Sequence, residues 1–195
     1  MRDLTYYVAC SVDGFIAHNS GSHDGFSQED DYIADIAVEF PETFPAQFRT
    51  ALNIEADNQH FDTVLMGRRT YKVGLDAGIS NPYPHLKQYV FSRSLEKSPD
   101  EGVELVSDDA IARVKTLKDE SGKGIWLCGG AMLATALFNE KLIDRLILKV
   151  NPFLMGSGIS LFAGVIKQTP LMLTAHKIYT NGVSRLDYQI GDHQQ

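Results

Sequence analysis

The stretch of residues 124–138 constrains the possible fold more than any other part of the chain; it consists of Gly-Ile-Trp-Leu-Cys-Gly-Gly-Ala-Met-Leu-Ala-Thr-Ala-Leu-Phe. Residues 125–128 form a short apolar run bounded by glycines, which predicts a buried strand. Apolar residues then recur at helical spacing, at Ala134, Leu137 and Phe138. Gly129 and Gly130 are the whole connection between the two elements. A strand joined to a helix in this way indicates an α/β fold.

The glycine pair allows two interpretations. Glycine lets the backbone take positive φ and lets a ligand approach the main chain closely. The helix that follows points free N–H groups and the positive end of its dipole at the same turn, which suits a phosphate or pyrophosphate. Alternatively, the two glycines only close a tight turn and nothing binds there.

The rest of the chain repeats the alternation of strand and helix. Residues 4–10 form a continuous apolar run, typical of a strand covered on both faces. Further strands are predicted at residues 63–66, 88–92, 103–106 and 145–150. Asp108 is expected to cap a helix whose Ile111, Val114 and Leu117 face inward. The pattern predicts an α/β fold with a central mixed, mostly parallel sheet and flanking helices.

The C-terminal part predicts an antiparallel hairpin. Residues 171–179 and 183–190 are β-rich and flank Thr180-Asn181-Gly182. Asn-Gly between two such runs is a strong hairpin signal. Leu186, Tyr188 and Ile190 alternate with polar residues, which predicts a half-buried strand.

A length of 195 residues suits a single domain over 1–195. Residues 41–62 are the least regular part, because Pro41 and Pro45 interrupt helix while Phe48 and Leu52 suggest a short one. This segment is either a helical insertion packed on the core or a lid over a site.

Composition narrows the functional classes. A net charge of −7 argues against general nucleic-acid binding and requires any anionic ligand to meet a local cluster of cations. No stretch approaches the ~20 apolar residues that cross a membrane. With no expected signal peptide, a cytoplasmic location is the simplest prediction. The histidines are scattered and the two cysteines, Cys10 and Cys128, suit buried thiols, so no metal site is expected.

Residues suited to binding follow four of the predicted strands, where ligands of α/β sheets lie. They are Ser11, Asp13 and Gly14 after the first strand; Gly67, Arg68, Arg69 and Thr70 after the second; Ser92, Arg93 and Ser94 after the third; and Gly129 and Gly130 after residues 125–128. Guanidinium groups form bidentate pairs with phosphate, so the arginines suit the 2′-phosphate of NADPH. The alternatives are a solvated helix start for Arg68 and Arg69, a surface arginine for Arg93 and a turn residue for Asp13.

Five segments occur in an order that resembles the dihydrofolate reductase-like superfamily. They are Ser11-Val-Asp-Gly-Phe-Ile-Ala17, Val64-Leu-Met-Gly-Arg-Arg-Thr-Tyr71, Val90-Phe-Ser-Arg-Ser94, Ile125-Trp-Leu-Cys-Gly-Gly130 and Pro152-Phe-Leu-Met-Gly-Ser-Gly158. The chain is most similar to the branch typified by the reductase domain of the bifunctional riboflavin-biosynthesis deaminase-reductase. The resemblance extends over residues 4–190.

The resemblance implies a three-layer fold, an NADPH cofactor across the carboxyl ends of the strands, and a homodimer. The cofactor residues that it implies are Gly67, Arg68, Arg69 and Thr70 for the 2′-phosphate and pyrophosphate; Ser92 and Arg93 beside the adenosine; Gly129, Gly130, Ala131 and Met132 for the pyrophosphate; and Ala9, Ile16 and Ala17 around the nicotinamide. The implied activity is reduction of a small heterocyclic substrate, foremost the ribosylamino-pyrimidine intermediate of riboflavin synthesis. Asp13 is the first candidate for a catalytic polar group near the substrate.

Two alternatives remain open. A dihydrofolate or pterin reductase has a Trp after its first strand and an acidic residue on the next helix. In this chain Trp126 is the single Trp, and Asp31 and Asp35 are candidates for the acidic role. The other alternative is a dimeric nucleotide-binding module without catalytic activity.

Overall fold

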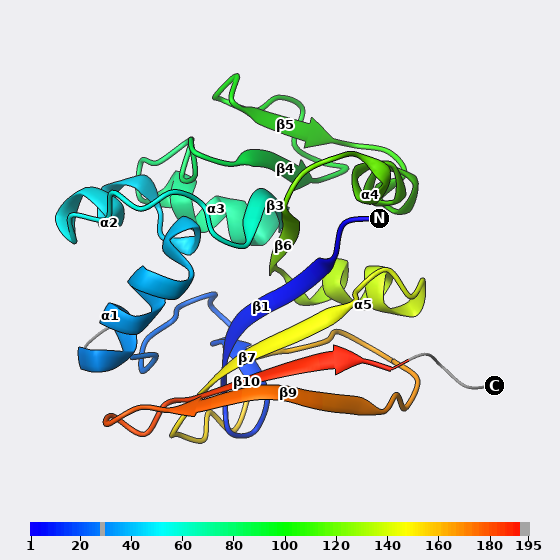
Figure 1. Ribbon diagram of the computed structural model, residues 1–195. Helices are drawn as coiled ribbons and strands as arrows, with labels where there is room; N and C mark the ends of the chain where they lie inside the picture. The colour runs from blue at the N-terminus through cyan, green and yellow to red at the C-terminus, as the bar shows by residue number, and fades with distance from the viewer. Residues whose placement is uncertain (28–29, 192–195) are drawn as a thin grey trace.

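The computed structural model describes residues 1–27 and 30–191, and an eight-stranded sheet runs through its centre (Figure 1). The strand order is β5-β4-β3-β6-β1-β7-β10-β9. The strands are β1 Leu4–Ser11, β3 Phe61–Gly67, β4 Lys87–Phe91, β5 Val103–Val106, β6 Gly124–Gly129, β7 Arg145–Asn151, β9 Leu171–Ile178 and β10 Ser184–Ile190. Each predicted strand is therefore present, with ends that differ by one or two residues.

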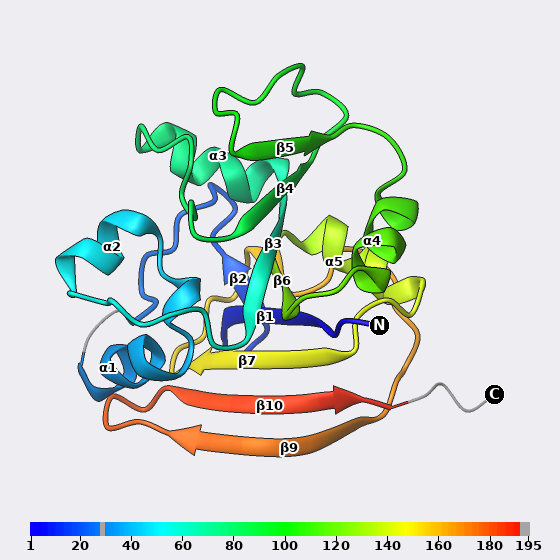
Figure 2. The same ribbon diagram turned by 45° about the horizontal axis from the view of Figure 1, so that its top comes forward.

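The sheet is mixed and mostly parallel, as predicted. The strands from β5 to β7 pair in parallel with their neighbours. β10 is antiparallel to both β7 and β9, and these two antiparallel strands lie together at one edge in Figure 2. The Asn-Gly turn therefore makes the expected hairpin. A second, two-stranded sheet pairs β2 Phe15–Ala17 with β8 Ile159–Ser160.

Helices cover both faces of the sheet, which produces three layers. They are α1 Asp30–Glu39, α2 Ala46–Ala51, α3 Arg68–Asp76, α4 Ala110–Asp119 and α5 Ala131–Asn139, with a short 3-10 helix, η1, at Pro41–Thr43. Alternate side chains of a strand point to opposite faces. Tyr7 of β1 accordingly packs in the core under α1 and α3, while Tyr6 packs in the core under α4 and α5.

The two ends of residues 41–62 are anchored to the core. The Glu42 side chain is fully buried, and its carboxylate accepts hydrogen bonds from the backbone N–H groups of Gln59, His60 and Phe61. These bonds tie the beginning of the segment to its end, directly before β3. The helix α2 between the two ends has no buried residue. The choice between a packed helical insertion and a lid stays a prediction.

Two local predictions need correction. Asp109, not Asp108, caps α4, because the helix begins one residue later than predicted and the Asp109 carboxylate accepts from Ala112 N–H at 3.0 Å. In β10 the alternation of side chains is present, but its polar side is also covered. Arg185 and Asp187 are buried there, 6% and 5% exposed.

The cysteines and the helices agree with the compositional analysis in the part of the chain that the structure describes. Cys10 and Cys128 are free thiols; Cys10 is buried and Cys128 is partly buried. Among residues 1–27 and 30–191, each helix is too short or too polar to span a bilayer.

Candidate functional site

Four strand ends that carry the predicted binding residues lie next to one another. β4, β3, β6 and β1 are consecutive in the sheet and parallel, so they end at a common edge. A cavity of about 720 Å³ lies at this edge. Its walls include most of the residues expected to bind the cofactor, namely Ile16, Gly67, Arg68, Arg69, Ser92, Arg93, Gly130, Ala131 and Met132.

The remaining predicted residues lie close to this cavity but do not line it. They are Ala9, Ala17, Thr70 and Gly129. Thr70 lies behind the glycine pair, because its hydroxyl would be 3.3 Å from a Cβ added to Gly129 and 3.4 Å from one added to Gly130. Ala17 is buried in β2. Cofactor contacts by these residues remain a prediction.

The glycine turns at the ends of β3 and β6 pack against each other. A Cβ on Gly67 would lie 3.2 Å from the backbone nitrogen of Gly130. Gly129 has a φ of +147°, and the Gly129–Gly130 peptide is cis. Side chains at these positions would push the two turns apart. The glycines therefore close a tight turn, and ligand binding at this turn stays a prediction.

Two helix N-termini point toward the cavity from these turns. α3 begins after Gly67 and α5 begins after Gly130, and neither start has a side-chain cap or an acidic residue in its first turn. The first N–H groups of a helix have no partner within the helix, and the helix dipole makes this end positive. The N-termini of α3 and α5 therefore favour the binding of an anion in the cavity from two sides.

Three arginines at the cavity have no partner within the described part of the chain. Arg68, Arg69 and Arg93 are exposed, and no hydrogen bond or ion pair joins their guanidinium groups to another described residue. By contrast, Arg2 pairs with Asp62 and Arg113 with Glu104. A chain with a net charge of −7 thus concentrates unneutralised cations at one cavity.

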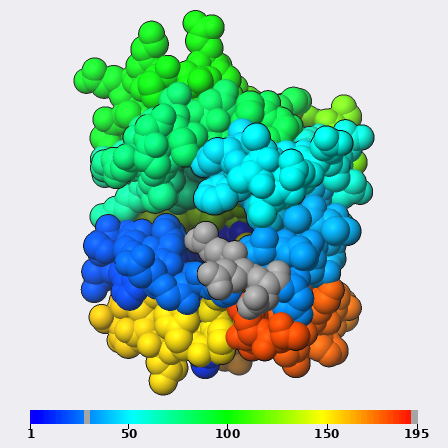
Figure 3. Space-filling view, turned by 90° about the vertical axis from the view of Figure 1, so that its left-hand side faces the viewer, coloured from blue at the N-terminus to red at the C-terminus, as the bar shows by residue number. Residues whose placement is uncertain are grey.

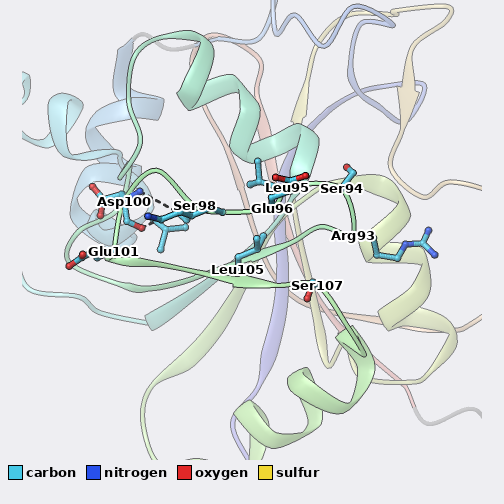
Figure 4. A pocket seen from close by; sticks show the side chains of 11 residues that line it. Arg93, Ser94, Leu95, Glu96, Ser98, Asp100, Glu101, Leu105 and Ser107 are labelled. Atoms are coloured by element: carbon cyan, nitrogen blue, oxygen red, sulfur yellow. Dashed lines mark hydrogen bonds between the residues drawn. The ribbon is translucent and has the colours of Figure 1, made fainter.

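A more open pocket of about 640 Å³ adjoins the cavity (Figure 4). Arg93, Ser94 and Ser107 line both spaces. In Figure 4 the Arg93 side chain points away from Asp100 and Glu101, the acidic part of this pocket. The Ser92 hydroxyl accepts from the N–H groups of Ser94 and Leu95, so it stabilises the turn that presents Arg93.

Asp13 lies in the loop after β1 and holds two loops together. Its carboxylate accepts hydrogen bonds from the Ser11 hydroxyl at 2.6 Å and from the N–H groups of Met155 and Gly156 at 3.0 and 2.7 Å. The Ser11 bond, followed by the Met155 bond, lowers the pKa of Asp13 to about 2. An acid that is ionised at neutral pH does not supply a proton. The geometry favours a structural role over the catalytic role predicted for Asp13.

The candidates for a pterin-binding acid are engaged elsewhere. Asp31 accepts from the backbone N–H and the hydroxyl of Thr180. Asp35 pairs with Lys177 and accepts from the Tyr179 hydroxyl at 2.6 Å. The carboxylates on α1 thus hold the C-terminal hairpin. Trp126 is buried and donates to the carbonyl of Tyr7 at 3.0 Å.

Sequence analysis did not single out Lys149. This residue lies in β7, and its ammonium is 4.1 Å from the centre of the Tyr7 ring. Burial lowers its pKa to about 8. One signal was present in the sequence, because Lys149 is the single charged residue inside the otherwise apolar run 146–150. No group of three or more His, Cys, Asp or Glu suited to a metal ion occurs among residues 1–27 and 30–191.

Comparison with known sequences identifies one family model and two relatives that match the chain. A model of the RibD C-terminal domain matches residues 2–184. The uncharacterized protein YwjB of Bacillus subtilis (strain 168) is 32% identical over 182 residues, which cover 93% of this chain and 95% of YwjB. The uncharacterized protein YyaP of the same organism is 27% identical over 198 residues, covering 96% of this chain and 94% of YyaP.

Solved structures share the fold. A protein of Shewanella sp. PV-4, which its name links to riboflavin biosynthesis, superimposes with a TM-score of 0.72 at 20% identity, covering 98% of this chain and 99% of that one. The diaminohydroxyphosphoribosylaminopyrimidine deaminase/5-amino-6-(5-phosphoribosylamino)uracil reductase of Thermotoga maritima has a TM-score of 0.62 at 12% identity. The match covers 97% of this chain and 57% of the Thermotoga protein.

Proposed function

This chain belongs to the RibD C-terminal domain family, and we propose that it is a cytoplasmic, NADPH-dependent reductase of a small heterocyclic substrate. Within that class we propose a pyrimidine related to 5-amino-6-(5-phosphoribosylamino)uracil, the substrate in the name of the Thermotoga maritima protein. A nicotinamide cofactor supplies a hydride when it is bound. The protein's part is to hold the cofactor and the substrate, to exclude water and to provide a proton.

One observation carries the proposal. Arg68, Arg69 and Arg93 line a single cavity and have no partner among the described residues, and two helix N-termini without side-chain caps open into the same space. Exposed guanidinium groups without a protein partner are available to bind a phosphate. A dinucleotide with a 2′-phosphate and a pyrophosphate has negative charge at two separated places, which matches this arrangement.

The glycine turns fit the same ligand. Because the main chains at Gly67 and Gly130 approach so closely, no side chain stands between the backbone N–H groups and a bound pyrophosphate. Exposed backbone of this kind is what a phosphate requires. The residues that would hold the cofactor are thus the two turns and the three arginines.

Titration with NADPH and NADH, followed by thermal unfolding, tests the proposal. A ligand that binds only the folded state raises the melting temperature. We expect a larger shift with NADPH than with NADH. Replacing Arg68 and Arg69 together by Ala should weaken NADPH binding by roughly 100-fold or more, because each of the two charge-assisted hydrogen bonds contributes about 1.5–3 kcal/mol. NADH binding should change little.

Lys72→Ala is the matched control, since Lys72 lies on the same helix and already pairs with Asp76. It should leave both affinities unchanged. Absence of a shift with either nucleotide in the unaltered protein would contradict the proposal. Binding of NADPH without oxidation by any pyrimidine would instead favour the non-catalytic module. The pterin alternative has no support in the geometry, because Asp31 and Asp35 are bonded to the hairpin.

A further inference from the structure

Lys149 is a cation in the middle of the sheet without a counter-ion. In β7 it is in register with Ala9 of β1 on one side and with Arg185 of β10 on the other. Its ammonium contacts the face of the Tyr7 ring at 4.1 Å. Among residues 1–27 and 30–191 it forms no hydrogen bond and no ion pair.

Among residues 1–27 and 30–191 the three fully buried cations are paired, whereas Lys149 is half-buried. Lys118 pairs with Asp144 and donates to the carbonyl of Leu142, and Arg2 pairs with Asp62. Arg185, the register neighbour of Lys149, takes both nearby carboxylates, those of Glu39 and Asp187. Removing a charge from water without a partner is costly, so buried charges are normally paired. Lys149 departs from this rule, which suggests that its partner is a ligand.

Lys149 lies on the face of the sheet toward α1. Side chains two residues apart on a strand share a face. Ala9, Cys128 and Lys149 follow Tyr7, Trp126 and Ile147 by two residues, and these three residues lie in the core under α1. Ala9, Cys128 and Lys149 nevertheless keep part of their surface accessible. Figure 3 shows the side of the molecule on which α1 lies, with a hollow near its middle.

This face of the sheet adjoins the place expected for the reactive end of the cofactor. Cys128 directly precedes the Gly129–Gly130 turn, and Ala9 is the residue that the family resemblance places at the nicotinamide. Lys149 lies one strand farther along the sheet than Ala9. A substrate between α1 and the sheet would therefore meet the Lys149 ammonium beside the carbon that is reduced.

We propose that Lys149 contacts the substrate directly, binding the oxygen or nitrogen of a C=O or C=N group in a planar substrate and donating a proton to that atom. The proposal rests on the proposed reductase function, which supplies the reductant as a nicotinamide cofactor. Hydride adds to the carbon, and the π electrons move to the oxygen or nitrogen. That atom takes the proton from the ammonium, and the neutral amine regains a proton from water. The substrate is reduced and the cofactor is oxidised.

The chemistry of Lys149 suits this role better than that of Asp13. With a pKa near 8, the ammonium is charged at neutral pH yet loses its proton readily. A lysine held in an apolar site is a common source of a mobile proton.

A purely structural role makes the opposite prediction about stability. If Lys149 were present only for its contact with Tyr7, then Lys149→Met would lose a favourable cation–π contact and lower the melting temperature. If it is an unpaired cation kept for a ligand, Met removes the cost of burial and the melting temperature stays equal or rises. The measurement needs neither cofactor nor substrate.

The experiment compares Lys149→Met, Lys149→Arg and the surface control Lys115→Met. For Lys149→Met we expect a melting temperature no lower than that of the unaltered protein and an unchanged affinity for NADPH. Turnover of 5-amino-6-(5-phosphoribosylamino)uracil should fall by about 100-fold or more, the usual contribution of a general acid. Lys149→Arg should restore substrate affinity but not turnover, because guanidinium does not release its proton. Lys115→Met should match the unaltered protein in all three measurements.

The outcomes separate this proposal from the proposed function. Failure of the unaltered protein to bind NADPH contradicts the proposed function, and the melting temperatures then decide the status of Lys149 alone. A lower melting temperature for Lys149→Met overturns the proposal. So does turnover by Lys149→Met at the rate of the unaltered protein. A melting temperature that is maintained, together with loss of turnover, supports it.

Discussion

At the scale of single residues, Lys149 should give the protein a recognisable dependence of stability on pH. Burial lowers its pKa from 10.5 to about 8. Between these values the unfolded chain binds more protons than the folded chain, so the free energy of unfolding rises with pH. Burial raises the pKa of Cys128 to about 12 and those of Tyr7 and Tyr83 well above 10.0, while Arg185 stays charged, so no neighbour titrates in this window.

We therefore expect the advantage of Lys149→Met over the unaltered protein to shrink as the pH rises from about 8 to 10.5. Denaturant unfolding at a series of pH values measures this difference in the free energy of unfolding. The surface lysines are the same in both proteins, so their titration cancels in the comparison. Two stability profiles that run parallel across the window would show that Lys149 titrates normally.

Asp13 should stabilise the fold in its charged form, in contrast to Lys149, whose charged form lowers stability. The Ser11 hydroxyl and the Met155 N–H lower its pKa from 3.8 to about 2. The carboxylate therefore stabilises the fold when the pH lies above its ordinary pKa, and this contribution is lost as the pH falls from 3.8 toward 2. Asp13→Asn should melt earlier than the unaltered protein at neutral pH, and the difference should close in acid.

Asp24→Asn is a suitable comparison for Asp13→Asn, because Asp24 is also exposed and lies in the next loop, after β2. It should leave the melting temperature unchanged at both pH values. If Asp13→Asn matched the unaltered protein at neutral pH, the carboxylate would not hold the two loops together. In that event its catalytic role would need renewed consideration.

At the scale of helices and strands, α4 offers a test of the capping correction. Asp109 accepts from Ala112 N–H, and Asp108 forms no such bond. Loss of an N-cap side chain costs about 0.5–2 kcal/mol. We expect Asp109→Ala to lower the free energy of unfolding by about 1 kcal/mol and Asp108→Ala to lower it much less. Equal effects in urea unfolding would contradict this assignment.

The order and type of the elements could be predicted because their signals are local. Apolar runs of β1 and β6, the glycine pair and the Asn-Gly turn depend on neighbouring residues alone. The positions of the binding turns could be predicted from the same strands, because parallel strands end at a common edge. This locality explains why the predicted cofactor residues largely gather around one cavity.

Features that depend on distant parts of the chain could not be predicted. The polar side of β10 suggested a solvent face, but α1 covers it and Glu39 of that helix neutralises Arg185. The partners of Asp13 come from the loop after β7, and Asp31 and Asp35 bond to the hairpin. The lack of a counter-ion for Lys149 among the described residues can be recognised only in the folded structure. Each of these depends on tertiary packing.

At the scale of the whole molecule, β9 is an exposed edge strand of the sheet. All eight residues of β9 are exposed. They include apolar side chains on both faces of the strand, with exposures of 42% for Leu171, 61% for Met172, 48% for Leu173 and 72% for Ile178. An edge strand with free backbone groups and apolar side chains readily pairs with another strand. We propose that a second copy of the chain covers β9, which gives the homodimer expected from the family resemblance.

Replacing Met172 by Lys should therefore convert a dimer into a monomer, because a charge at the contact must lose its water when the two copies meet. Light scattering coupled to gel filtration measures the mass. Val73→Lys is the control, since Val73 is 48% exposed on α3, which packs on β3 and β4 toward the opposite edge of the sheet from β9, and it should leave the dimer intact. A monomeric mass for the unaltered protein over a wide range of concentration would exclude this interface. Dissociation by Val73→Lys but not by Met172→Lys would place the contact on α3 instead, with the β9 edge left open to solvent.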